Sequence, residues 1–129
     1  MRINIKETLM EEYASARNER VFFDTNKIVS ASDGCTVDAA GNLWTALIGT
    51  GEIVCIDPEG VLKVRLEMPI PLPSSVNFGG STLSTLYVTS IRDSGNRTDN
   101  HPLSGHLFAL HNLGDTGLQE PRFGMPSSL

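Results

Sequence analysis

The sequence predicts an all-β protein assembled from repeated antiparallel strand pairs, on the strength of two observations. Residues 34–38 and 42–48 are apolar segments of strand length that flank a tight turn, and Gly41 in that turn can adopt the positive φ it requires. The same layout recurs at Val76–Phe78 and Leu86–Thr89. A strand-pair repeat of about 40–45 residues indicates propeller blades rather than a sandwich.

The remaining strands follow from turn and breaker residues. The first complete blade takes its strands from residues 34–38, 42–48, 52–57 and 61–67. Pro58 and Gly60 give its last turn, and the prolines of Met68–Pro73 block further pairing, so that segment is the link to the next blade. The second blade takes strands near 75–78, 85–91, 106–111 and 121–124, and Arg20–Asp24 gives one earlier strand.

The two ends of the chain are expected to lie outside this repeat. Apolar residues recur every four positions near the N-terminus, at Ile5, Leu9 and Tyr13, with charged residues between them. This spacing predicts that the N-terminal segment, residues 1–18, forms a short helix or is disordered. We interpret that segment as the foreign start of a truncated gene. The domain would then cover residues 19–124, and the tail 125–129 should fray.

The composition is that of an ordinary soluble domain. The chain has 129 residues, of which 40% are hydrophobic and 19% charged. Its 10 basic and 15 acidic residues give a net charge of −5 without a basic cluster, which argues against a nucleic-acid surface. No apolar run approaches the ~20 residues of a membrane helix, and the N-terminus has no signal-peptide core. We therefore expect no nucleic-acid partner, no membrane partner and a cytoplasmic location.

Cysteine and histidine residues suggest structural or surface roles. Cys35 and Cys55 fall on the first and third strands of one blade, about 9–10 Å apart, which is beyond disulfide reach. We expect both thiols to be reduced and buried. His101, His106 and His111 recur every five residues, so two of them would lie on opposite strand faces and would not form a zinc set. Trp44 and Phe78 are expected in the core between blades.

An ordered set of short segments carries a family resemblance. These segments are Asp33-Gly34, Val37-Asp38, Gly41-Asn42-Leu43-Trp44, Asp57-Pro58, Phe78-Gly79-Gly80, Leu86-Tyr87-Val88-Thr89-Ser90, Pro102-Leu103-Ser104-Gly105 and Glu120-Pro121-Arg122-Phe123. Over residues 20–124 the chain resembles the SMP-30/gluconolactonase/luciferin-regenerating-enzyme family, which includes regucalcin. The resemblance implies the C-terminal part of a six-bladed propeller, about two blades plus one strand, and metal-dependent hydrolysis of sugar lactones.

Asp33 is the candidate site residue. Taken alone, an Asp before Gly is more typical of a turn cap. The resemblance instead places it at the family's metal-binding Asp, which implies that Asp33 binds a divalent metal, commonly calcium, and acts as the catalytic base. The family's other protein ligands, a Glu and an Asn, would lie in blades that this chain does not contain.

Three functions therefore remain open at this point. The chain could be a partial lactone hydrolase with a sugar lactone as substrate. It could also be a non-catalytic remnant or binding module, or a half-propeller that assembles with copies of itself. Two isolated blades should leave apolar faces and a strand edge uncovered, so we expect the chain to be either poorly soluble or a homo-oligomer, with a threefold ring as one geometric option.

Overall fold

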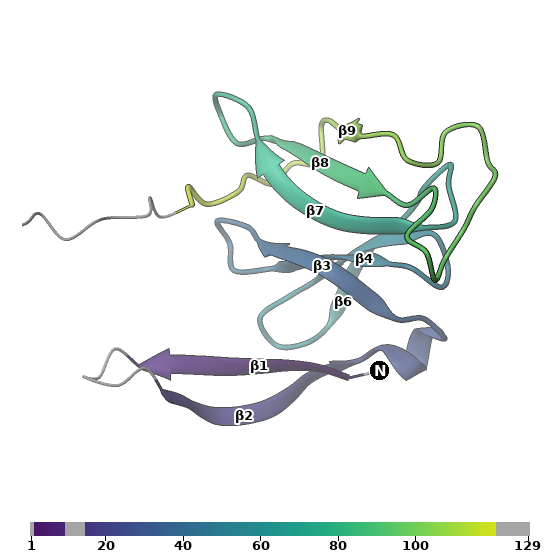
Figure 1. Ribbon diagram of the computed structural model, residues 1–129. Coiled ribbons are helices and arrows are strands. Elements are labelled where there is room, and N and C mark those ends of the chain that lie inside the picture. Colours follow the sequence, from purple (N-terminus) through teal and green to yellow (C-terminus); the bar gives the residue numbers. More distant parts are fainter. Residues whose placement is uncertain (1, 10–14, 121–129) are drawn as a thin grey trace, which may run out of the picture.

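The structure is a computed structural model that describes residues 2–9 and 15–120 and is all-β apart from one short 3-10 helix. Its elements are β1 (Arg2–Leu9), β2 (Ser15–Asp24), η1 (Thr25–Ile28), β3 (Ser32–Val37), β4 (Leu43–Leu47), β5 (Glu52–Ile56), β6 (Leu62–Glu67), β7 (Pro73–Gly79), β8 (Thr85–Ser90) and β9 (Phe108–Leu110). They form a β1-β2 hairpin, a four-stranded sheet β3-β4-β5-β6 and a three-stranded sheet β7-β8-β9, all antiparallel. Figure 1 shows these sheets stacked as three layers.

The predicted strands of both repeats are confirmed as far as the described residues reach. β3 to β8 lie where the sequence places them, within two residues at each end. The strand predicted at 106–111 is shorter, because only Phe108–Leu110 pairs with β8. The predicted strand at 121–124 and the tail 125–129 lie outside the described residues.

The predicted N-terminal helix is wrong. Residues Arg2–Leu9 form strand β1, which pairs with β2 from Arg2↔Asp24 to Leu9↔Ser15. The start of the chain alternates polar and apolar residues, with Ile3 and Ile5 between Arg2, Asn4 and Lys6, which is a strand period. The pattern that predicted a helix used Tyr13, which lies outside the described residues.

The four-stranded sheet is the centre of the molecule because it is buried on both faces. Every residue of β4 and β5 is buried. One face, with Trp44, packs on Phe78 of the three-stranded sheet, and the ring centroids are 5.9 Å apart in an edge-to-face arrangement. The other face packs on Phe22 and Phe23 of β2. The predicted place of Trp44 and Phe78 in the core between sheets is confirmed.

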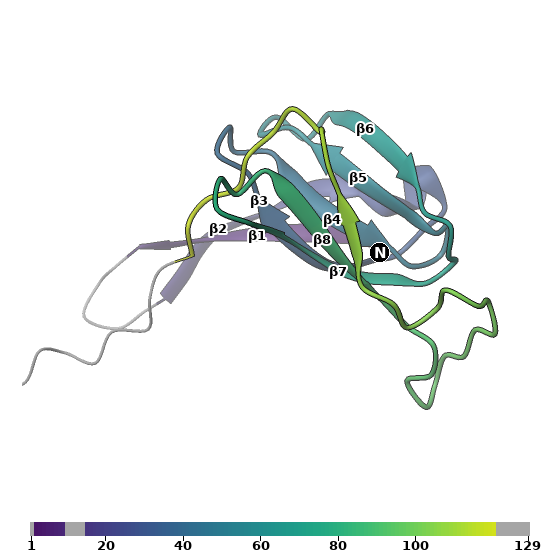
Figure 2. The same cartoon turned by 90° about the horizontal axis from the view of Figure 1, so that it is seen from above.

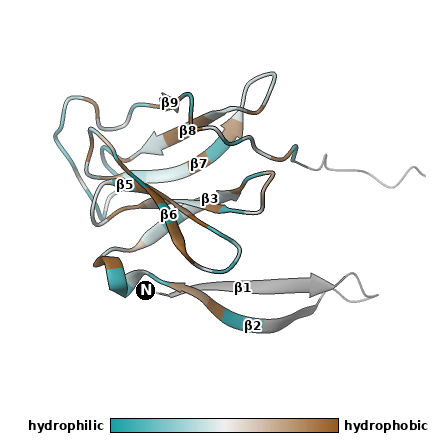
Figure 3. Cartoon of the chain, turned by 180° about the vertical axis from the view of Figure 1, so that it is seen from behind, coloured by the Kyte–Doolittle hydropathy of each residue, from teal (hydrophilic) through white to brown (hydrophobic). Residues whose placement is uncertain are grey.

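Two turns at the same end of this sheet have the same hydrogen-bonding plan. In the β3–β4 turn, Asp38 Oδ1 accepts hydrogen bonds from the backbone N–H groups of Ala40 and Asn42, both at 2.9 Å. In the β5–β6 turn, Asp57 Oδ1 accepts from Glu59 and Val61, at 3.0 and 2.8 Å. These side chains replace backbone partners that a tight turn leaves unpaired. Figure 3 colours much of the β5–β6 turn as hydrophilic.

A segment after β9 ties the two larger sheets together. Ala39 N donates to Thr116 O at 2.7 Å, and Gly117 N donates to Leu83 O at 2.8 Å. Asp38 and Gly117 also form an isolated antiparallel bridge. The segment therefore connects the β3–β4 turn to the β7–β8 turn and closes the end of the core opposite the start of β3.

The two faces of β8 differ in polarity. Leu86 and Val88 of β8 point into the core, whereas Thr85, Tyr87 and Thr89 alternate with them on the outer face. Two of these three outward positions are threonine. Among the described residues, no helix is long and apolar enough to cross a bilayer.

Candidate functional site

The candidate site lies at the end of the sheets where β3 and β7 begin. One row of paired residues crosses the four-stranded sheet there, from Ser32 through Leu47 and Glu52 to Glu67. The link to β7 meets the loop after β8 at the same end, where Ile91 N donates to Leu72 O at 2.9 Å. That loop projects away from the sheets in Figure 2.

Asp33 occupies the second position of β3 and its side chain is exposed. The next residue, Gly34, is where β3 approaches β7 most closely, because a Cβ there would lie 2.1 Å from Ser75 Oγ and 2.7 Å from Ser75 Cα. Two residues further on, Thr36 Oγ1 donates to Asn77 Oδ1 at 3.2 Å. A side chain at position 34 would force the strands apart, so Gly34 fixes where β3 presents Asp33.

Asp33 alone would supply a metal with one ligand at this place. Asp33 is an oxygen donor of the type that calcium prefers. However, the described part of the chain has no group of three or more His, Cys, Asp or Glu side chains that could hold a metal ion. The three histidines are exposed, as predicted. The residues present therefore fit one position of a calcium site and do not form a complete one.

The Asp38 carboxylate accepts four hydrogen bonds, whereas the sequence placed this residue only at the end of a strand. Its side chain is 1% exposed. Besides the two turn bonds, Oδ2 accepts from Asn42 Nδ2 at 2.8 Å and from Trp44 Nε1 at 2.9 Å. Burial raises the pKa of Asp38, but the hydrogen bonds from Asn42 and Trp44 outweigh burial and hold the pKa below its usual value of 3.8.

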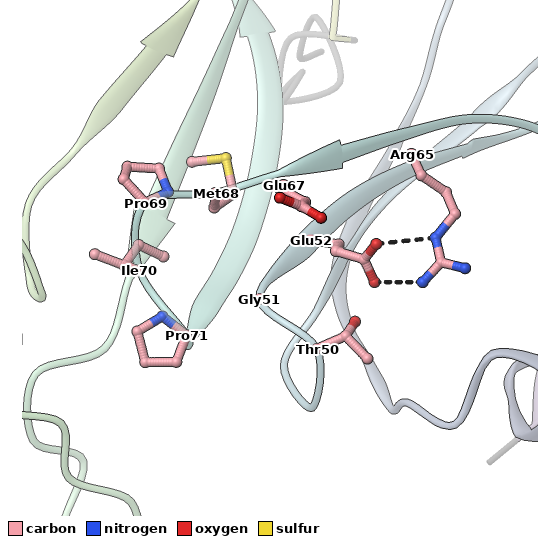
Figure 4. Close-up of a pocket in the computed structure, with 9 residues that line it drawn as sticks. All are labelled: Thr50, Gly51, Glu52, Arg65, Glu67, Met68, Pro69, Ile70 and Pro71. Carbon is pink, nitrogen blue, oxygen red and sulfur yellow. Dashed lines mark hydrogen bonds and ion pairs between the residues drawn. The ribbon is translucent and has the colours of Figure 1, made fainter.

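A second buried carboxylate, Glu52, was missed by the sequence analysis. Arg65 Nε donates to Glu52 Oε1 at 2.9 Å, and Arg65 Nη2 donates to Oε2 at 2.7 Å. This forked pair is the strong geometry for an arginine and a carboxylate. The hydrogen bonds from Arg65 exceed the opposing effect of burial and lower the pKa of Glu52 from its usual 4.5. Figure 4 shows the pair beside a hollow of about 530 Å³.

These two carboxyl groups predict how stability depends on pH. Their folded-state pKa values lie below 3.8 and 4.5, so in acid the unfolded chain binds more protons than the folded one. The free energy of unfolding should be constant near neutral pH and fall as the pH drops below about 5. Asp38→Asn and Glu52→Gln should each flatten this fall. Urea unfolding at a series of pH values measures it, and equal stability at about pH 6 and pH 3 would contradict it.

The cysteines are only partly as predicted. Both are free, and they lie on β3 and β5, which are not neighbours in the sheet. Cys55 is buried, and burial raises the pKa of its thiol to about 11. Cys35 is exposed, which corrects the expectation that both would be buried. The reason is its place on an edge strand, whose odd-numbered positions from Asp33 to Val37 are exposed.

Comparison with known proteins identifies the family. Residues 5–92 match the model of the "SMP-30/Gluconolactonase/LRE-like region". The chain belongs to this family. The match begins within residues 1–18, a segment that the sequence analysis had placed outside the resemblance, and it includes most of β1.

Known family members extend well beyond the matched part. The chain is 37% identical to a 6-deoxy-6-sulfogluconolactonase from Pseudomonas putida over 93 residues, which is 70% of this chain and 32% of that protein. A solved luciferin-regenerating enzyme matches 91% of this chain and 40% of its own, with 30% identity and a TM-score of 0.76. A calcium-binding regucalcin from Agrobacterium tumefaciens matches 84% and 37%, with 30% identity and a TM-score of 0.73.

The chain thus spans about a third of the length of the relatives that it matches in sequence. Its antiparallel sheets of four and three strands superpose on the propeller folds of regucalcin and the luciferin-regenerating enzyme.

Proposed function

We propose that this chain is the part of a metal-dependent sugar-lactone hydrolase that carries the Asp33 carboxylate. In this proposal β3–β6 is one complete blade of a six-bladed propeller, β7–β9 are three strands of the next blade, and β2 is the outer strand of the blade before. Asp33 would be one ligand of a calcium ion and the base of the reaction. The two free cysteines support a cytoplasmic location.

The observation that carries the proposal is the position of Asp33 within a family member. The carboxylate is exposed at the open start of β3, and the contacts of Gly34 and Thr36 with β7 hold that strand in place. Two of the matched proteins, a sulfogluconolactonase and a calcium-binding regucalcin, support the lactone and the metal in this proposal.

In this proposal, the described residues supply only part of the calcium site. Calcium takes about 6–8 oxygen ligands, and one carboxylate does not hold it tightly. The remaining ligands have to come from other parts of a longer propeller. No catalytic step is assigned to Asp33 without them.

A non-catalytic remnant or binding module is the second candidate. The observation that favours it is the lack, within the described ranges, of any cluster of three or more metal-ligating side chains. A chain of this kind would keep the blade fold and bind without hydrolysing.

Calcium titration combined with a gluconolactone hydrolysis assay tests the proposal on the chain as it is. We expect no tight calcium binding and no hydrolysis above the rate with calcium alone, because the ligand set is incomplete. Asp33→Ala should then change nothing measurable. Robust hydrolysis that disappears in Asp33→Ala would overturn the incomplete-site part and show that copies of the chain assemble the site. Hydrolysis that survives Asp33→Ala would overturn the role of Asp33.

A further inference from the structure

The hollow shown in Figure 4 does not include Asp33 in its lining, although both lie at the same end of the four-stranded sheet. It is bounded by the β4–β5 hairpin, the end of β6 and the link to β7. Its lining residues are Thr50, Gly51, Glu52, Arg65, Glu67, Met68, Pro69, Ile70 and Pro71. The row from Ser32 to Glu67 crosses three strand spacings, which places β6 roughly 14 Å from the strand of Asp33.

The walls of the hollow are fixed by the protein itself. Met68 N donates to Gly51 O at 2.9 Å, which joins the link to the hairpin. Gly51 has a φ of 70°, and a Cβ there would lie 2.9 Å from Ile70 O, so the two segments pack backbone to backbone. Ile70 is only 2% exposed. A ligand would therefore meet a preformed surface, and binding would not have to order these segments.

The charges around the hollow do not balance. Glu52 and Glu67 stand directly opposite each other in the β5–β6 register, and like charges in such a pair are unfavourable. Arg65 directs its Nε and Nη2 atoms to the carboxylate of Glu52. Glu67 is exposed and makes no direct hydrogen bond or ion pair with the described residues. Arg65 therefore reaches Glu67 only through a longer-range electrostatic attraction, and the three side chains together carry one excess negative charge.

We propose that this hollow binds a small organic cation with an aliphatic body, such as an alkylguanidinium. The cationic head would lie against Glu67, where a guanidinium can pair with both carboxylate oxygens. The alkyl part would lie against the side chains of Met68, Pro69 and Pro71, which are half-buried or exposed. The excess negative charge disfavours an anionic ligand. This site does not depend on the proposed lactone chemistry.

A titration of the chain with n-butylguanidinium, followed by amide chemical shifts in NMR spectra, tests the proposal. N-butylurea is the control ligand, because it has the same shape without the charge. We expect saturable shifts at Gly51 and Ile70 with a dissociation constant on the order of millimolar, and at least about threefold weaker binding of the urea.

Two matched variants test whether the Glu67 carboxylate is the group that binds the guanidinium. Glu67→Gln should weaken butylguanidinium binding by at least about threefold, whereas Glu59→Gln, which removes the same charge from the exposed turn at the other end of β6, should leave it unchanged. Thermal unfolding of each variant verifies that it is folded. Equal binding of the two ligands, equal effects of the two variants, or no shifts at Gly51 and Ile70 would each overturn the proposal.

Discussion

Asp38→Asn is expected to lower the free energy of unfolding by about 3 kcal/mol. The Asp38 carboxylate accepts four hydrogen bonds and is 1% exposed. An asparagine amide would turn an N–H₂ group toward one set of these donors, which include Trp44 Nε1 and Asn42 Nδ2. Those buried donors would lose their acceptor, and no water could reach them to replace it. Because Trp44 also packs on Phe78, the change would loosen the contact between the two larger sheets.

Asp57→Asn is the matched control. Asp57 makes the same two backbone bonds in the β5–β6 turn, and those bonds are exposed. We expect it to cost about 1 kcal/mol. Urea unfolding followed by the fluorescence of Trp44, the single tryptophan, measures both variants. Equal losses for Asp38→Asn and Asp57→Asn would show that the turn bonds, and not the contacts with Asn42 and Trp44, are what stabilise the fold.

The strands could be predicted because local chemistry determines them. The turn with Gly41, which has a φ of 85°, and the turn that Asp57 begins set the ends of β3 to β6. Alternation of apolar residues then places Leu86 and Val88 toward the core. At the N-terminus, local pattern was ambiguous between the two periods, and pairing with β2 decided it in favour of a strand.

Contacts between residues that are far apart in the sequence could not be predicted from the local pattern of apolar and turn residues. Glu52 and Arg65 are 13 positions apart and meet only because the β5–β6 register brings them together. The same holds for Gly34 and Ser75, whose contact depends on how two sheets approach each other. The sequence placed Asp38 at the end of a strand, but its hydrogen bond with Trp44 depends on the burial of both side chains.

The candidate site was predicted by resemblance and not by residue chemistry. An Asp before Gly is a common turn element. Nothing near Asp33 in the sequence distinguishes a metal ligand from such a turn. The structure adds where Asp33 lies, at the exposed start of an edge strand, together with the Gly34 contact that positions that strand.

The most direct measurement of the central claim, that Asp33 is a metal-binding and catalytic carboxylate, uses a chimera. The matched 93-residue segment of the Pseudomonas putida lactonase would be replaced by the corresponding part of this chain. The rest of that protein would supply the remaining ligands. If the proposal holds, we expect the chimera to hydrolyse the lactone that the parent enzyme acts on and to need a divalent metal such as calcium, because Asp33 would then complete a ligand set.

Asp33→Ala in the chimera should lower kcat/KM by at least about 100-fold and weaken calcium binding measured by calorimetry, while thermal unfolding of the metal-free protein stays the same. The Asp57→Ala chimera, which loses an exposed turn carboxylate, should keep its activity and its affinity for calcium. An Asp33→Ala chimera that binds calcium and hydrolyses the lactone as well as its parent would contradict the assignment of Asp33.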